Sequence, residues 1–324
     1  MASSDAVRQQ LRRMGALLDA DPVPSEVWSS DDGVLYHYTV PESWPLLRRV
    51  SKAVASSMSR VRMKRKIRLN RAYWDNLAGS GEEKRDVIMH ALRRATTTGV
   101  IVSLELPGFM LMPNLTLNTP GIYPDILAAI TPALLHLDLS GNHFGHMGIR
   151  ALVPNLSTCT ALTHLDLSNT ALHQHGMLEI GSVLPRLTAL AHLNLSCNFP
   201  MAPPAFIAMY QDVLPRCRAM THLDLSANSI SDQGLADLVS ALCECPALLE
   251  LNLSGNSIRG LATASFVRVL AHWPLLRRLD VRWCIQHVDQ GAGRLSQQIR
   301  AAWLAGVNAG TMTDVNAEPR ALLL

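Results

Sequence analysis

The sequence predicts an α/β repeat protein in which short strands alternate with helices. A pattern L-x-x-L-x-L-x-x-N recurs at intervals of 28, 28, 30, 28 and 28 residues, in units that begin at Leu134, Leu162, Leu190, Met220, Leu248 and Leu276. The first half of each unit alternates apolar and polar residues, and the second half has apolar residues at helical spacing. A fixed period of this length is typical of repeats that stack on their neighbours and bury a shared core.

The first half of a unit, such as LTHLDLSNT at 162–170, predicts a strand with one buried face. Side chains alternate across a strand, so Leu165 and Leu167 are expected to point inward. His164, Asp166 and Ser168 then point outward together. The Asn of the pattern is expected to turn the chain and to bond backbone groups that would otherwise be buried and unpaired. It stands at Asn142, Asn198, Asn228 and Asn256.

The second half of a unit predicts a helix. In SISDQGLADLVSALCECP the apolar residues fall on one helical stripe, formed by Ile230, Leu235, Leu238, Val239 and Leu242. Asp232 stands where a helix N-cap is expected, and Pro246 follows the expected end.

These units resemble leucine-rich repeats of the ribonuclease-inhibitor-like type, in which a 28-residue unit reads L-x-x-L-x-L-x-x-N followed by a helix. The resemblance covers about residues 101–300. It implies a right-handed solenoid shaped like a horseshoe, with a parallel sheet on the concave face and helices on the convex face.

The chain is expected to divide into three parts. Residues 1–99 form a mainly helical N-terminal arm and cap. Residues 100–284 hold about seven repeats, counting a degenerate upstream unit that begins at Ile101, and residues 285–324 form a capping helix and tail. The last repeat has Cys284 where the pattern has Asn, so the sheet is expected to end there.

The outward positions form three columns along the stack. The first column contains His136, His164, His192, His222, Glu250 and Arg278; the second contains Asp138, Asp166, Asn194, Asp224, Asn252 and Asp280; the third is Ser in five units and then Arg282.

These columns do not predict an active site. A catalytic triad needs His between Ser and Asp, whereas here Asp lies between His and Ser in each unit that contains all three. Neighbouring histidines could share a metal ion, but a regular ladder of His and Asp is also typical of a solvated surface. We therefore expect no catalytic residue, metal, cofactor or small-molecule substrate, and the protein is not expected to be an enzyme.

Partner binding is instead expected where the columns vary, because anchor residues of an interface differ from unit to unit. The candidates at the C-terminal end are Glu250, Arg278, Arg282 and Trp283. A second set lies in the proline-rich stretch of the unit that begins at Leu190, at Pro200, Pro203 and Pro204.

A basic segment at 60–71, RVRMKRKIRLNR, is a candidate contact for RNA or another polyanion. Its cations are Arg60, Arg62, Lys64, Arg65, Lys66, Arg68 and Arg71. Apolar and charged residues partly alternate, so an extended conformation is expected. The alternative is a solvated basic face that binds nothing.

Residues 22–57 also resemble an F-box. Pro24 and Glu26 match the opening of that motif, and Leu46, Leu47, Val50 and Lys52 match its end, although the span is several residues too long. This resemblance implies a substrate adaptor of a ubiquitin ligase.

The charge and cysteine content favour a protein whose surface is covered by partners in a reducing compartment. Residues 1–100 hold 17 Lys and Arg against 11 Asp and Glu, whereas residues 101–324 hold 12 against 15. The low number of charged residues in 101–324 suggests a surface that partners cover. A compositional bias of the source organism would give the same low number. The six cysteines have no zinc-type spacing, and the longest apolar stretch is too short to span a membrane.

The expected function is a non-catalytic scaffold, a subunit of a multi-protein assembly such as an organellar ribosome or another ribonucleoprotein, or a ciliary complex. The alternatives are the ubiquitin-ligase adaptor and a regulator of a GTPase. The expected location is intracellular, cytoplasmic or alternatively mitochondrial, since Arg8, Arg12 and Arg13 give the N-terminus some transit-peptide character.

Overall fold

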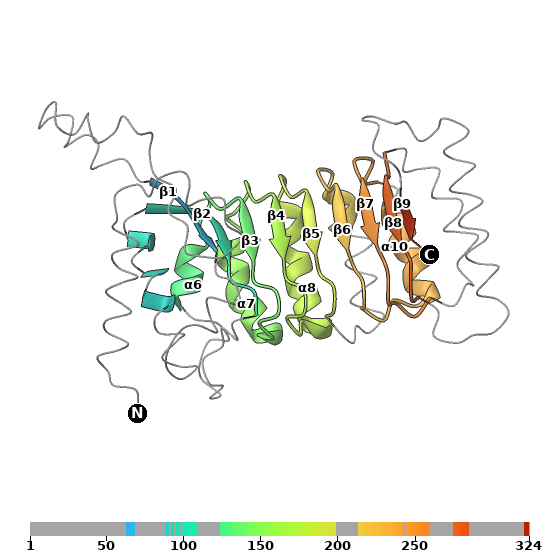
Figure 1. The fold of residues 1–324 in the computed structure, drawn as a ribbon, viewed down its shortest axis with the longest axis horizontal. Coiled ribbons are helices and arrows are strands. Elements are labelled where there is room, and N and C mark those ends of the chain that lie inside the picture. The colour runs from blue at the N-terminus through green and yellow to red at the C-terminus, as the bar shows by residue number, and fades with distance from the viewer. Residues whose placement is uncertain are drawn as a thin grey trace, which may run out of the picture.

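Nine strands form one parallel sheet, and their order in the sheet follows their order in the chain (Figure 1). The computed structural model describes residues 63–68, 88–90, 92–93, 95–97, 99–108, 124–198, 213–242, 244–258, 275–284 and 321–323. The strands are β1 (Met63–Arg68), β2 (Gly99–Glu105), β3 (His136–Asp138), β4 (His164–Asp166), β5 (His192–Asn194), β6 (His222–Asp224), β7 (Glu250–Asn252), β8 (Arg278–Asp280) and β9 (Ala321–Leu323).

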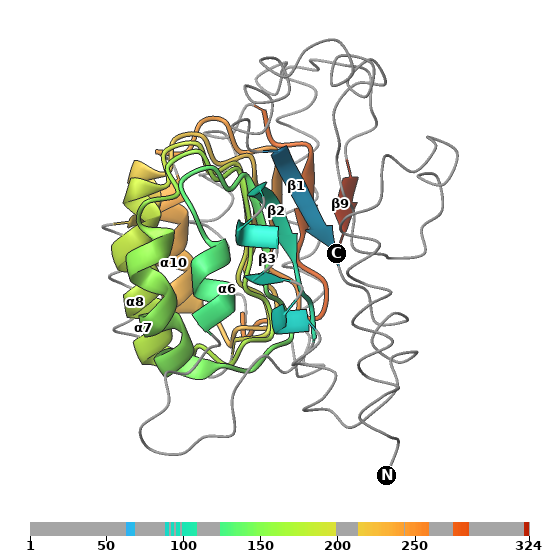
Figure 2. The same cartoon turned by 90° about the vertical axis from the view of Figure 1, so that its left-hand side faces the viewer.

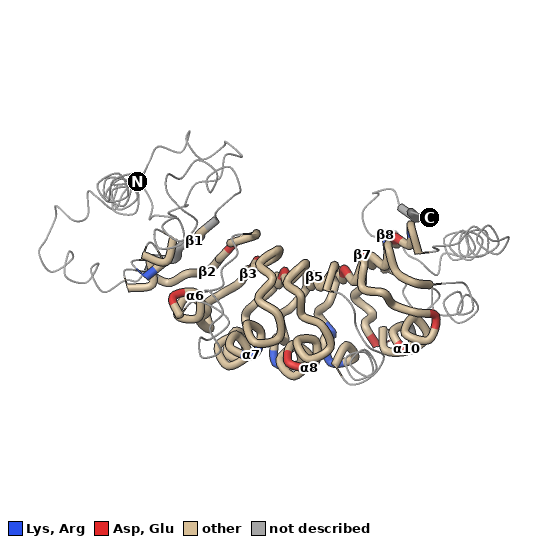
Figure 3. The backbone as a smooth tube through the Cα atoms, turned by 90° about the horizontal axis from the view of Figure 1, so that it is seen from below, with Lys and Arg blue, Asp and Glu red and all other residues tan. Residues whose placement is uncertain are grey.

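Helices cover one face of this sheet (Figure 2). They are α6 (Pro124–Ala129), α7 (Gly145–Leu156), α8 (His173–Val183) and α10 (Asp232–Leu242), with short 3-10 helices η2 (Leu184–Arg186) and η4 (Leu214–Arg216). Seen along the strands, the sheet lies on the inner side of an arc and the helices on the outer side (Figure 3). The predicted horseshoe, with a parallel sheet on the concave face and helices on the convex face, is confirmed. None of the helices in these described ranges is both long and apolar enough to cross a membrane.

The core is a stack of leucines placed by the strand register. Leu137, Leu165, Leu193, Leu223, Leu251 and Leu279 pair in sequence from β3 to β8, and each is at most 2% exposed. Full burial of one such side chain stabilises the fold by roughly 1.5–3 kcal/mol relative to exposure. The inward orientation predicted from the alternation is therefore confirmed along the whole stack.

The predicted asparagine ladder is also confirmed. Asn142, Asn198, Asn228 and Asn256 are all 0% exposed. The Asn198 amide donates to the carbonyl oxygens of Leu167 and Leu195, and the backbone N–H of Asn198 donates to the Asn228 Oδ1 at 2.8 Å. Each amide thus joins two repeats through backbone groups that no water can reach.

Two replacements keep the ladder continuous where the pattern lacks Asn. Thr170 is fully buried and donates through Oγ1 to the Leu167 carbonyl oxygen at 2.6 Å. Cys284 takes the same place in the last repeat, and its Sγ lies 3.1 Å from the Leu253 carbonyl oxygen.

The expectation that the sheet ends at Cys284 is wrong. Residues Ala321–Leu323 form β9, which pairs with β8 in parallel through Arg278 and Ala321. Because the thiol of Cys284 bonds the preceding repeat as Asn would, the last repeat keeps its shape and offers β8 as an edge. The capping helix expected in the tail, the F-box-like segment at 22–57 and the prolines at 200–204 lie outside the described residues.

The N-cap of α10 is Ser231, not Asp232 as the sequence suggested. The backbone N–H of Gly234 donates to Ser231 Oγ at 3.3 Å, and Asp232 is the first residue of the helix. Ile230, Leu235, Leu238 and Leu242 of the predicted stripe are buried.

Replacement of Ser231 by alanine should lower the free energy of unfolding by about 0.5–1 kcal/mol, because the Gly234 N–H loses its side-chain acceptor. Chemical denaturation followed by circular dichroism measures the change. Ser240→Ala is the matched control in the same helix, and it should not destabilise because exposed Ser240 only bonds the Ala236 carbonyl. Equal losses in both variants would contradict the assigned cap.

Candidate functional site on the concave face

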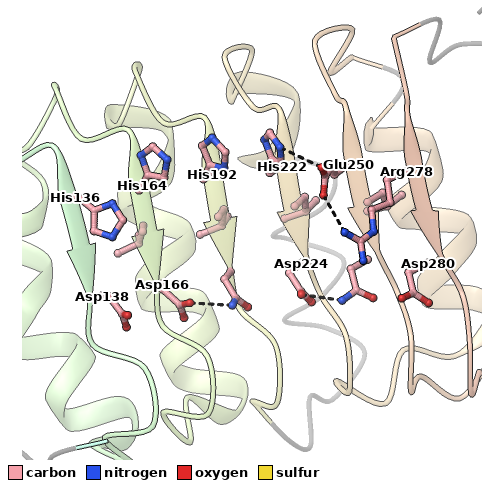
Figure 4. Close-up of a pocket in the computed structure, with 16 residues that line it drawn as sticks. His136, Asp138, His164, Asp166, His192, His222, Asp224, Glu250, Arg278 and Asp280 are labelled. Carbon is pink, nitrogen blue, oxygen red and sulfur yellow. Dashed lines mark hydrogen bonds and ion pairs between the residues drawn. The ribbon is translucent and has the colours of Figure 1, made fainter. Parts of the chain in front are cut away.

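Two polar rows run across the concave face and line a groove of about 440 Å³ (Figure 4). The strand register sets His136, His164, His192, His222, Glu250 and Arg278 side by side in the first row. It sets Asp138, Asp166, Asn194, Asp224, Asn252 and Asp280 in the second row. The outward columns predicted from the sequence are therefore brought together as predicted.

The second row terminates the strands. Asp166 Oδ1 accepts from the backbone N–H of Ser168 at 2.8 Å, and the same bond recurs at each position of the row. Such side-chain bonds to the backbone two residues ahead stabilise turns. The serines predicted to face outward with the aspartates thus act mainly through their backbone N–H groups.

Side-chain amides also join members of the second row. Asn194 Nδ2 donates to Asp166 Oδ2 at 2.9 Å, and Asn252 Nδ2 donates to Asp224 Oδ2 at 2.8 Å. Burial raises the pKa of Asp166 above its usual range, although these bonds and the Ser168 N–H favour the ionised form. From β4 to β8 the alternation of Asp and Asn therefore separates the carboxylates, whereas Asp138 and Asp166 lie on neighbouring strands and Asp138 helps to raise the pKa of Asp166.

The first row contains a stack of four imidazole rings, here called the histidine row: His136, His164, His192 and His222. Ring centroids lie 5.0, 4.0 and 3.9 Å apart from one ring to the next. A carboxylate stands at each end of the stack. Glu105 Oε1 lies 3.8 Å from His136 Nε2, and Glu250 Oε1 lies 3.6 Å from His222 Nε2.

Two threonines orient rings of the histidine row. Thr163 Oγ1 lies 2.8 Å from the Leu135 carbonyl oxygen and 2.8 Å from His164 Nδ1. A carbonyl oxygen can only accept, so a hydroxyl that donates to it accepts from a protonated Nδ1. Thr221 has the same arrangement with the Ala191 carbonyl oxygen and His222. In this tautomer Nε2 carries the lone pair and acts as a hydrogen-bond acceptor.

The interior of the histidine row favours neutral rings. Burial, and then the charges of the neighbouring histidines, lower the pKa of His192 to about 4. Burial and the same like charges lower the pKa of His164. A protonated ring here would lose hydration and face other cations at stacking distance. Near neutral pH the interior rings of His164 and His192 are therefore uncharged.

At the C-terminal end, Arg282 is held in place by an ion pair, whereas the side chain of Trp283 is largely exposed. Arg282 donates through Nη2 to Asp280 Oδ2 at 2.6 Å, which fixes the guanidinium against the second row. Arg278 Nη1 lies 4.0 Å from Glu250 Oε2. Trp283 is 83% exposed and has a φ of 58°.

The basic segment reaches the sheet through β1, which confirms the expected extended conformation. Lys66 is exposed and pairs with Ser103 of β2, which in turn pairs with His136, so Lys66 extends the first row. Lys64, Arg65 and Arg68 also belong to β1. Arg60, Arg62, Arg71, Pro200, Pro203 and Pro204 lie outside the described residues.

Two contributors to the rows were not recognised in the sequence. Glu105 pairs with Asp138 and meets His136, and Lys66 lies one strand further. Applying the strand spacing of the repeat to the degenerate unit at Ile101 places Ser103 and Glu105 in the two rows, so the sequence contained the signal for Glu105.

The described residues offer no group of three or more His, Cys, Asp or Glu side chains that could hold a metal ion. Five of the cysteines are described, all as free thiols, and Cys197 is the exposed one among them. Burial raises the pKa of Cys159, Cys217 and Cys284 to about 11, which keeps these thiols protonated.

Comparison with known proteins gives one family match. The model of the family described as "Leucine Rich repeat" matches residues 132–153 and 216–239. No curated protein matches the chain.

Several solved structures are similar at low identity. The tropomodulin C-terminal domain of Caenorhabditis elegans is 12% identical, with a TM-score of 0.28 over 51% of this chain and 80% of that one. A TLR13–ssRNA13 complex is 16% identical, with a TM-score of 0.37 over 73% of this chain and 34% of that one. The ectodomain of the Arabidopsis receptor kinase HAESA, bound to a peptide hormone, is 18% identical, with a TM-score of 0.28 over 55% of this chain and 33% of that one.

Proposed function

The chain is a leucine-rich repeat protein, and from this premise we propose that it is a non-catalytic scaffold that docks a partner protein at the C-terminal end of its concave face. Leucine-rich repeat proteins mediate protein–protein interactions, and the curvature of such solenoids creates an extended concave surface for binding. Members of this family are typically interaction scaffolds and not enzymes.

The observation that carries the docking site is the backbone of Trp283. In every repeat the residue before the Asn position has a positive φ: Gly141, Asn169, Cys197, Ala227, Gly255 and Trp283. The left-handed conformation costs about 1–2 kcal/mol for residues other than glycine. A bulky aromatic held there, and 83% exposed, gains nothing from the core of the protein. Strain of this kind supports a functional role for the side chain.

The neighbours of Trp283 suit an interface. Tryptophan and arginine are the residues most enriched among anchors of protein complexes. Arg278 keeps 52% of its side chain exposed, and Glu250 keeps 43% exposed. Arg282, held by Asp280, is already fixed in position and would lose little entropy on binding.

Replacement of Trp283 by glycine should release the partner without loss of stability. Glycine removes the strain of the positive φ, so the free energy of unfolding should stay the same or rise by up to about 1 kcal/mol. Sedimentation of native lysate from cells that express the tagged full chain measures assembly. We expect wild type to sediment in a larger complex and the variant to shift toward the free monomer.

Ala227→Gly is the matched control, because Ala227 occupies the same positive-φ position in an inner repeat. It should keep the sedimentation of wild type. Wild-type protein that sediments as a free monomer would contradict the scaffold proposal, and unchanged sedimentation of the Trp283 variant would contradict the docking site.

We further propose that the assembly is a ribonucleoprotein, contacted through the basic segment at 60–71. What supports this is the exposed cation Lys66 at the edge of the sheet, in a strand where four of six residues are basic. Ribonuclease treatment before sedimentation should then reduce the size of the complex. A protein-only assembly, as in a ciliary complex, would keep its size.

A further inference from the structure

We infer that the groove over β2–β7 binds an arginine- and lysine-rich segment of a partner protein near neutral pH and releases it on acidification. This inference rests on the proposed scaffold function and adds a second surface, next to Trp283, with a defined partner chemistry. It follows from the charge of the groove, the hydrogen-bonding state of the imidazoles and the carboxylates at the ends of the histidine row.

The concave face over β2–β7 is acidic, and it overlaps most of the groove, whose lining runs from β3 to Arg278 and Asp280 of β8. On the six strands from β2 to β7, the two rows contain no Lys or Arg and five carboxylates: Glu105, Asp138, Asp166, Asp224 and Glu250. Cations enter the first row only beyond these strands, at Lys66 on β1 and Arg278 on β8. A concave surface lined by charges of one sign concentrates field lines and attracts the opposite charge.

The rest of the groove accepts hydrogen bonds. The neutral imidazole of His164, whose Nδ1–H is held by Thr163, presents Nε2 as an acceptor. Lysine and arginine side chains carry only donors, and the guanidinium has five of them in a planar fork. An acceptor surface with a negative field therefore matches cationic side chains better than apolar or acidic ones.

Protonation of the histidine row weakens both properties. The groups that face the row are Glu105 on β2, the aspartates of the second row on β3, β4 and β6, Glu250 on β7, Arg278 on β8 and Lys66 on β1. Each protonation in the row would make the formal charge of the β2–β7 rows, −5 at neutral pH, less negative by one and turn that Nε2 from acceptor into donor. Protonated His136 and His222 would also pair with Glu105 and Glu250, which removes these carboxylates from the partner.

Fluorescence anisotropy with the full chain tests the inference. The probe is a fluorescein-labelled peptide of five Arg-Gly pairs, titrated between about pH 7.5 and 5 at constant ionic strength. We expect binding at neutral pH and a roughly tenfold loss of affinity on acidification, since interfacial charge pairs dominate such contacts. Circular dichroism at each pH locates unfolding, and the loss of binding should occur while the protein is folded.

Two sets of variants assign the effect to the groove. Glu105→Gln with Glu250→Gln should weaken binding at neutral pH roughly fivefold or more. His136→Gln with His222→Gln should reduce the pH dependence, because glutamine does not titrate. His146→Gln with His175→Gln is the matched control, since these rings lie near each other on the exposed faces of α7 and α8. It should keep the wild-type pH dependence.

Several outcomes would overturn the inference. They are equal affinity of wild type for the peptide at both pH values, loss of affinity only where the protein unfolds, or equal binding of a peptide of Glu-Gly pairs. The wild-type comparison requires no variant to fold.

The two experiments distinguish an error in the inference about the groove from an error in the proposed scaffold function. If the arginine peptide does not bind while Trp283→Gly still disrupts the native complex, the inference about the groove is wrong and the scaffold proposal stands. If wild type is a free monomer in lysate, the scaffold proposal is wrong, whatever the peptide does.

Discussion

Replacement of Asn198 by alanine is expected to lower the free energy of unfolding by about 3–5 kcal/mol. Asn198 is 0% exposed. Its Oδ1 accepts from the backbone N–H groups of Thr170 and Leu172, and its Nδ2 donates to the carbonyl oxygens of Leu167 and Leu195. Alanine would leave these backbone groups buried without partners, and each unsatisfied group costs about 1–3 kcal/mol. Chemical denaturation followed by circular dichroism measures the loss.

Two further variants show whether the backbone contacts explain the effect. Asn155→Ala is the same substitution at a half-buried position, where Nδ2 donates only to the Leu127 carbonyl oxygen, and it should cost about 1 kcal/mol. Asn198→Thr should destabilise less than Asn198→Ala, because Thr170 already fills this position in the preceding repeat with a bond to a strand carbonyl. A loss at Asn198→Ala no larger than at Asn155→Ala would show that the ladder does not support the stack.

The asparagine ladder and the leucine stack could both be predicted because they depend on one residue type at one position per repeat. Burial of Leu165 or Leu223 follows from alternation along a strand, which holds for any strand with one face on a core. The backbone N–H and C=O groups of the turn after the strand are buried. A small side chain that has both a donor and an acceptor can form hydrogen bonds with both kinds of group.

Other features depend on partners distant in the sequence, and the pattern alone did not predict them. The pairing of β9 with β8 joins Arg278 to Ala321 across more than 40 residues, and no repeat motif marks Ala321. The N-cap of α10 was assigned one residue late because Ser231 and Asp232 are both common caps. The choice between them depends on where the helix begins, which single sequences locate poorly.

For the candidate site, the sequence predicted the positions of the histidines on the sheet but not the orientation and protonation of their rings. It placed His164 and His192 side by side on one face, and the register confirms this. It did not predict that their rings stack with centroids 4.0 Å apart or that Thr163 bonds the Nδ1 of His164, because both depend on side-chain rotation. The ring stacking and the Thr163 bond distinguish a row of imidazoles that accept hydrogen bonds from a ladder of polar side chains that only contacts water.

The stability of the protein should fall as the pH falls from about 6.5 to about 4, in part because of His192. Burial first, and then the charges of neighbouring histidines, lower the pKa of His192 to about 4 in the folded protein. In the unfolded chain a histidine has a pKa of about 6.5. Between these values the unfolded state binds more protons, so acidification favours unfolding, and the loss is complete below the folded pKa.

The size of this effect is on the order of 1–2 kcal/mol, less than the full shift would give, because His192 is partly exposed and solvent screens its interactions. His164 acts in the same direction, since its pKa is lowered by the same causes. Free energies of unfolding measured at several pH values from about 7.5 to 4 test the prediction.

His192→Gln isolates the contribution of this residue from the carboxylates that also titrate at the acidic end. Glutamine cannot take up a proton, so the stability of wild type relative to the variant should decline steadily from about pH 6.5 to 4. His146→Gln, outside the row on the exposed face of α7, should leave the wild-type profile unchanged. A constant difference between wild type and His192→Gln would mean that the stacked rings do not resist protonation. The loss of negative charge inferred for the groove would then begin closer to neutral pH.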